Sequence, residues 1–132
     1  MTNNRILVVD DEPNLIKSLS FILTRGGFEV STAEDGEEAL RKAAEIKPVM
    51  MFLDIMMPKK NGYDVCQIIK STPGLKDIYI IMLSAKGWEA DREKALNLGA
   101  DEFMSKPFSP VEVINKVSKT MQEYFQCSSG RV

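Results

Sequence analysis

Three aspartates are the residues of this sequence whose types and spacing most strongly indicate chemistry. Asp10 and Asp11 follow an apolar run at residues 6–9, and Asp54 ends a second apolar run at residues 49–54. Short, continuous apolar runs are typical of strands that are buried on both faces of a parallel sheet. The carboxyl ends of such strands lie at the sheet edge where open α/β folds place their ligands. The sequence therefore predicts that three carboxylates meet at this edge.

Carboxylates this close together repel one another unless a cation joins them. A divalent ion that prefers oxygen ligands suits such a site, and Mg²⁺ is the ion that we expect. The chain contains no histidine, which excludes a histidine-based catalytic triad, a histidine metal site and a phosphohistidine within it.

The elements that must position the aspartates alternate regularly along the chain. We expect five strands, at residues 5–9, 28–32, 49–54, 78–84 and 102–105. We also expect five helices, at residues 13–25, 36–45, around 65–69, 89–98 and 110–124. Strands that alternate with helices predict an α/β fold with a doubly wound parallel sheet and helices on both faces.

Apolar residues at helical spacing predict which faces of the first and last helices are buried. In the first helix they are Leu15, Ile16, Leu19, Ile22 and Leu23. In the last helix they are Val111, Ile114, Val117, Met121 and Phe125. We expect both stripes to belong to the core.

The length of 132 residues suits one domain, which we expect over residues 1–126 with a flexible tail at 127–132. A net charge of −2 argues against a nucleic-acid-binding surface. No apolar run approaches the ~20 residues of a membrane span, and no signal peptide is evident. Cys66 and Cys127 match no metal or redox spacing and suit free thiols. We therefore expect a soluble, cytoplasmic protein.

Two more polar residues are expected at the same edge of the sheet. Ser84 ends the fourth strand, and Lys106 follows the fifth. Each has an ordinary alternative, because a serine can simply end a strand and a loop lysine can be solvated. Asp11 can likewise begin a helix, where acidic side chains interact favourably with the dipole. Their coincidence at one edge is what indicates a functional site.

The sequence resembles the receiver domain of two-component response regulators over about residues 4–125. The segments that carry the resemblance are Val9-Asp10-Asp11-Glu12, Leu53-Asp54-Ile55-Met56-Met57-Pro58, Leu83-Ser84-Ala85, Gly99-Ala100-Asp101-Glu102-Phe103 and Lys106-Pro107-Phe108. The resemblance implies a flavodoxin-like fold with strand order 2-1-3-4-5, in which the first and third strands are neighbours. It also implies a cis peptide bond between Lys106 and Pro107.

The resemblance implies that Asp54 is a phosphoacceptor, which takes a phosphoryl group from a histidine kinase and becomes an acyl phosphate. It implies that Mg²⁺ is bound directly by Asp11, Asp54 and the backbone carbonyl of Met56, with Asp10 nearby or acting through water. Lys106 would pair with Asp54 at rest and with the phosphoryl group afterwards. The chain would catalyse only its own phosphorylation and dephosphorylation, and would otherwise be no enzyme.

The resemblance also implies how the signal leaves the site. Ser84 would donate a hydrogen bond to the phosphoryl group and so sense it. The switch surface would comprise the fourth helix, the fifth strand and the fifth helix. Phe103 occupies the position of an aromatic residue that changes rotamer, and without the hydroxyl of the frequent tyrosine, packing alone would bias it. The alternative is a static, partly buried Phe103.

The implied partners are a sensor histidine kinase, a downstream output domain or protein, and a second copy of the chain at the switch surface. Direct nucleic-acid binding by this domain and membrane binding are not expected. Met56 offers no group that orients water, so we expect a long-lived phosphorylated state. Lys86 could tune the same reaction or simply be solvated. Trp88 could join an output surface or pack on the helix that follows it.

Other classes of function fit the sequence less well. A Mg²⁺-dependent phosphohydrolase with an aspartyl nucleophile would need two acids separated by one residue after the first strand, and an inserted cap. A flavodoxin-like nucleotide or flavin binder would need a phosphate-binding loop where Asp10-Asp11-Glu12-Pro13 would repel a phosphate. A degenerate receiver that only binds partners would not need the complete set of acids, serine and lysine.

Overall fold

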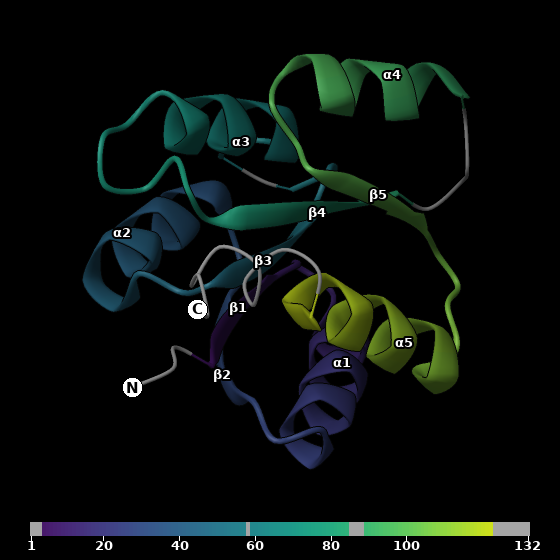
Figure 1. The fold of residues 1–132 in the computed structure, drawn as a ribbon. Helices are drawn as coiled ribbons and strands as arrows, with labels where there is room; N and C mark the ends of the chain where they lie inside the picture. The colour runs from purple at the N-terminus through teal and green to yellow at the C-terminus, as the bar shows by residue number, and fades with distance from the viewer. Residues whose placement is uncertain (1–3, 58, 85–88, 123–132) are drawn as a thin grey trace.

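Apolar strands form the centre of a five-stranded parallel sheet (Figure 1). They are β1 (Arg5–Val9), β3 (Met50–Asp54) and β4 (Tyr79–Ser84). In this computed structural model, which describes residues 4–57, 59–84 and 89–122, the more polar β2 (Glu29–Ala33) and β5 (Glu102–Ser105) lie at the two edges. The order β2-β1-β3-β4-β5 confirms the predicted flavodoxin-like topology.

Five helices cover both faces of the sheet (Figure 1). On one face lie α1 (Pro13–Arg25) and α5 (Pro110–Thr120), and on the other lie α2 (Gly36–Ile46), α3 (Gly62–Lys70) and α4 (Glu89–Asn97). Successive side chains along each strand point to opposite faces of the sheet and pack in two separate cores. Ile6 and Val8 pack in the core under α1 and α5, whereas Leu7 and Val9 pack in the core under the other three helices.

The predicted buried face of the last helix was wrong at one position. Val111 is 67% exposed, whereas Val113 and Val117 are fully buried. Ser109 caps this helix in a capping box, which fixes the residue at which it begins. Residues 113 and 117 lie on the same side of the helix because they are four apart, and that side packs in the core, whereas Val111 lies on the opposite side. Phe125 lies outside the described residues.

The remaining predicted bounds agree with the structure to within one residue, apart from the start of α3 and the end of α5. The third helix was expected around residues 65–69 and begins at Gly62. Residues 123 and 124 of that expected helix and the expected tail at 127–132 lie outside the described part of the chain. Within the described part, no helix has the length and the apolar character that crossing a bilayer would require.

One polar cluster ties the end of α3 to β4 and β5. The Nζ atom of Lys70 donates to the carbonyl oxygen of Ile78 at 2.7 Å and pairs with Oδ2 of Asp101 at 2.8 Å. The same Oδ2 atom accepts a hydrogen bond from the backbone N–H of Ile80 at 2.9 Å. Gly99 has a φ angle of +109°, and a Cβ atom there would lie 2.9 Å from Cγ of Lys70. The Gly99-Ala100-Asp101 segment therefore has a structural role in this cluster.

We predict that Asp101→Ala lowers the free energy of unfolding by about 2–4 kcal/mol, because it removes the acceptor of one ammonium and one backbone N–H. Urea denaturation at neutral pH measures the change. The matched control is Asp77→Ala, because Asp77 is exposed, and its effect should stay within about 0.5 kcal/mol of wild type. Equal effects of the two substitutions would contradict the prediction.

Candidate functional site

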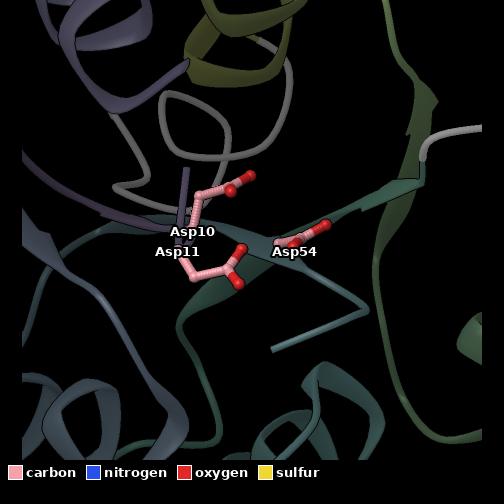
Figure 2. Close-up of side chains that lie close together, drawn as sticks. All are labelled: Asp10, Asp11 and Asp54. Carbon is pink, nitrogen blue, oxygen red and sulfur yellow. The ribbon is translucent and has the colours of Figure 1, made fainter. Parts of the chain in front are cut away.

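The pairing of β1 with β3 brings the three aspartates together at the carboxyl edge of the sheet (Figure 2). Val9 lies opposite Leu53 in this parallel pair, so the residues that follow them are neighbours. Carboxylate oxygens of Asp10, Asp11 and Asp54 lie within 4.8 Å of one another. Asp10 and Asp54 are buried, and Asp11 is exposed. The predicted meeting of the three carboxylates is confirmed.

Lys106 supplies a positive charge to this cluster from the end of β5. Its Nζ atom lies 3.2 Å from Oδ1 of Asp54 and 3.1 Å from Oδ2 of Asp10. The pair with Asp54 was expected, and the second contact, with Asp10, was not. The peptide bond between Lys106 and Pro107 is cis, as predicted. The backbone N–H of Lys106 donates to the carbonyl oxygen of Ser84 at 2.6 Å, which joins the ends of β4 and β5.

The local environment changes the acidity of both partners of this ion pair. Burial and the charge of Asp10 raise the pKa of Asp54 to about 6, although Lys106 acts in the opposite direction. Burial alone would lower the pKa of Lys106, but its hydrogen bond to Asp10 and the charge of Asp54 raise that pKa overall. One ammonium thus does not offset three carboxylates. This donor set and its excess of negative charge fit a divalent cation with oxygen ligands, such as Mg²⁺.

Asp10 is held differently from the other two aspartates. Its Oδ1 atom accepts a hydrogen bond from the backbone N–H of Glu12 at 2.9 Å, and its Oδ2 atom faces Lys106. Both of its carboxylate oxygens are therefore engaged by protein groups. This arrangement favours Asp11 and Asp54 as direct ligands of a cation, with Asp10 as a nearby charge.

The other predicted site residues lie in different surroundings. Ser84 is buried at the end of β4, one residue beyond Leu83, which lies opposite Asp54. Met56 is 75% exposed in the loop that follows β3. Phe103 is partly buried against the core under α2, α3 and α4. Two further predicted positions, at residues 86 and 88, lie outside the described residues.

Sequence reasoning did not identify the glycines that shape this edge. A Cβ atom on Gly62 would lie 2.2 Å from the carbonyl oxygen of Asp54, and one on Gly36 would lie 2.4 Å from the carbonyl oxygen of Lys60. The N–H of Gly62 donates to the carbonyl of Ile55 at 2.8 Å and closes the loop after β3. The only sign of this role in the sequence is that each glycine lies near the start of an expected helix. That position does not reveal that another backbone segment comes close.

A groove of about 440 Å³ lies beside the ion pair, between the start of α1 and the segment that follows β5. Its lining residues are Glu12, Asn14, Leu15, Ser18, Lys106, Pro107 and Phe108. A molecule seated in the groove would lie next to Lys106, which pairs with Asp10 and Asp54.

Comparisons with known proteins agree with this geometry. The family model described as the response regulator receiver domain matches residues 6–118. The chain is 45% identical over 120 residues to the alkaline phosphatase synthesis transcriptional regulatory protein PhoP of Bacillus subtilis, covering 91% of this chain and 49% of that protein. It is 40% identical over 113 residues to the DNA-binding response regulator MtrA of Mycolicibacterium smegmatis, covering 86% of this chain and 48% of that protein.

The chain thus spans about half the length of these curated relatives. Among solved structures, the chemotaxis response regulator CheY4 of Vibrio cholerae is similar with a TM-score of 0.84 and 28% sequence identity. That similarity covers 89% of this chain and 98% of the CheY4 chain.

We predict that Asp54 lowers the stability of the metal-free protein as the pH rises from about 4 to about 6. The folded protein keeps a proton on Asp54 up to a pKa of about 6, whereas the unfolded chain releases it near the ordinary value of 3.8. The favourable contribution of Asp54 to the free energy of unfolding is therefore fully present below about pH 4. It is lost as the pH rises through about 6. Asp54→Asn should be more stable than wild type at pH 7 by up to about 3 kcal/mol.

Urea denaturation in chelator-treated buffer between pH 4 and 7 measures this difference. Asp77→Asn, at an exposed position, is the control and should follow the wild type. A difference between Asp54→Asn and wild type that stays constant across this range would contradict the prediction.

Proposed function

The chain belongs to the response regulator receiver domain family, and on that premise we propose that Asp54 accepts a phosphoryl group from the phosphohistidine of a sensor kinase. One observation carries the proposal. Three carboxylates lie within 4.8 Å of one another at the sheet edge, with an ammonium 3.2 Å from Asp54. A cluster of this kind can bind a divalent cation, which with the ammonium would offset charge around a reacting phosphoryl group, while one carboxylate remains available as a nucleophile.

In the proposed reaction, a carboxylate oxygen of Asp54 attacks the phosphorus atom. The bond between phosphorus and the donor imidazole nitrogen breaks, and that nitrogen keeps the electron pair. The product is an acyl phosphate on Asp54. At pH 7 the carboxyl group is mostly ionised despite its raised pKa of about 6, so it can act as the nucleophile.

Lys106 and the acidic residues prepare this reaction. Lys106 pairs with Asp54 at rest and lies close enough to pair with a phosphoryl oxygen afterwards. Asp11, Asp54 and, by analogy with the family, the backbone carbonyl of Met56 would hold Mg²⁺, with Asp10 as a neighbouring charge. Bound Mg²⁺ would offset the carboxylates and the charge of the phosphoryl group.

The signal would leave the site through Ser84 and Lys106. Ser84 would donate its hydroxyl to the phosphoryl group, and its backbone carbonyl already accepts from Lys106 at the end of β5. A movement at either residue would reach β5, where Phe103 lies opposite Met82. The surface of α4, β5 and α5 would then bind an output domain or a second copy of the chain. Phe103 is the residue that we expect to change rotamer.

The groove suits the docking of the phosphodonor, because its lining includes Lys106, whose ammonium lies 3.2 Å from the nucleophile Asp54. The names of PhoP and MtrA describe transcriptional and DNA-binding regulators, so we infer that this receiver controls transcription through such an output. The domain itself would bind neither nucleic acid nor membrane, would act in the cytoplasm, and would catalyse only its own phosphorylation and dephosphorylation.

We predict that incubation with acetyl phosphate and Mg²⁺ adds the mass of one phosphoryl group to the wild-type protein. Asp54→Asn should show no adduct, because it lacks the nucleophile. Asp77→Asn is the matched control and should be phosphorylated like wild type, because Asp77 is exposed and removed from the acidic cluster. Intact mass spectrometry distinguishes these outcomes. The absence of an adduct on the wild type with metal present would count against the proposed function.

We predict that Met56→Asn shortens the lifetime of the phosphorylated state several-fold, because an amide can orient a water molecule and a thioether cannot. Met56→Leu, which also lacks such a group, is the control and should decay slowly. The measurement is the loss of phosphorylated mass after the donor is removed. An unchanged decay rate in Met56→Asn would refute this role of the side chain.

A further inference from the structure

We propose that the thioether of Met56 is a site of reversible oxidation by peroxides, and that its sulfoxide shortens the lifetime of a phosphoryl group on Asp54. The second half of this proposal rests on the proposed function, and the first half stands without it. The proposal follows from the accessibility of the sulfur atoms, the course of the chain after β3 and the polarity of a sulfoxide.

Met56 differs from the other described methionines in its accessibility. Its exposed fraction is 75%, whereas its neighbour Met57 is only partly exposed. The methionines that are at most 3% exposed are Met50, Met51, Met82 and Met104. Met121 is partly buried and packs against the core under α1 and α5. Because a peroxide must reach the sulfur atom, Met56 is the methionine of the described chain that should react first.

The described thiol does not compete for the oxidant. Cys66 is fully buried in α3, and its Sγ atom lies 3.8 Å from the carbonyl oxygen of Leu98. Burial raises the pKa of this thiol to about 11, so it carries almost no thiolate at neutral pH. Thiolate is the reactive form of cysteine, whereas a thioether needs no deprotonation. Cys127 lies outside the described residues.

The course of the chain places Met56 at the same edge as the acidic cluster. Ile55 is buried, and its N–H donates to the carbonyl of Leu83 at 3.1 Å, so the pairing of β3 with β4 continues one residue beyond Asp54. Met56 is the next residue, in the bend that follows β3, and its side chain is exposed two residues beyond Asp54. Asp54 and Met56 thus lie on either side, in sequence, of a residue that packs in the core. An oxidised Met56 would remain in solvent and leave both cores undisturbed.

Hydrogen peroxide supplies the oxygen atom and accepts the electrons in this oxidation. A lone pair of the sulfur attacks one peroxide oxygen, the O–O bond breaks, and after proton transfer the products are a sulfoxide and water. The thioether loses two electrons, which reduce the peroxide. The reaction is reversible in cells, because methionine sulfoxide reductases exist for both epimers of the sulfoxide.

The sulfoxide oxygen is a good hydrogen-bond acceptor, unlike the thioether sulfur. It can therefore hold a water molecule beside the acyl phosphate on Asp54. Attack of that water on phosphorus breaks the P–O bond to Asp54, which leaves as a carboxylate with the electron pair. The water gives up a proton to solvent, and inorganic phosphate is released. Oxidation of Met56 would thus shorten the lifetime of the phosphorylated state.

The test uses wild type and Met56→Leu, each with and without brief treatment with dilute hydrogen peroxide. Peptide fragmentation spectra locate the added oxygen and separate Met56 from Met57. The proteins are then phosphorylated with acetyl phosphate and Mg²⁺, and the phosphorylated mass is followed after the donor is removed. We expect Met56 to gain oxygen before the buried methionines, and oxidised wild type to lose its phosphoryl group several-fold faster than untreated protein.

Treated and untreated Met56→Leu should decay at equal rates, and methionine sulfoxide reductases A and B should restore the slow decay of oxidised wild type. Met56→Gln, which carries an oxygen acceptor without any oxidant, should decay faster than Met56→Leu. Oxidation of buried methionines at the rate of Met56 would overturn the first half of the proposal. An unchanged decay rate in oxidised wild type, or an equal acceleration in Met56→Leu, would overturn the second half.

Failure of untreated wild type to become phosphorylated would instead overturn the proposed function, and the second half of this proposal with it. The oxidation pattern measured by peptide mass would still decide the first half in that case.

Discussion

The repulsion among three neighbouring carboxylates is the interaction on which the proposed activity depends. Lys106 contacts Asp10 and Asp54, but one ammonium does not offset three negative charges. The raised pKa of Asp54, about 6, is a consequence of burial and this imbalance. Electrostatic repulsion therefore destabilises this edge of the sheet. Binding of a divalent cation, or a change in the charge of Asp54, would change the electrostatic energy of this site strongly. This sensitivity is what a phosphorylation switch requires.

The parallel sheet maintains this unfavourable arrangement because its apolar strands are buried on both faces. Every residue of β3 is buried, so Asp54 cannot move away from Asp10 without disturbing two cores. Gly62 allows the start of α3 to approach the carbonyl oxygen of Asp54, which closes the loop against the strand. The rigid strands thus position the acidic residues, while exposed loop residues such as Met56 can change without affecting the cores.

The local sequence predicted the structure correctly wherever residues that are close in the sequence decide it. Apolar runs predicted the central strands, and the alternation of strands with helices predicted a parallel sheet. The family motifs then supplied the strand order and the cis bond before Pro107, both of which the structure contains. The error at Val111 arose because apolar residues occur on two sides of α5, and only the packing of the helix against the sheet decides which side faces the core.

The sequence by itself determined the element types, the fold class and the presence of acids, a hydroxyl and a lysine at strand ends, because these follow from local pattern and strand polarity. Tertiary structure decided the rest. Lys106 contacts Asp10 as well as Asp54, although Asp10 and Lys106 are 96 residues apart, because β1, β3 and β5 end at the same edge. The need for glycine at residue 62 is likewise invisible in the sequence, since it arises from the backbone of another segment reaching the space that a side chain would fill.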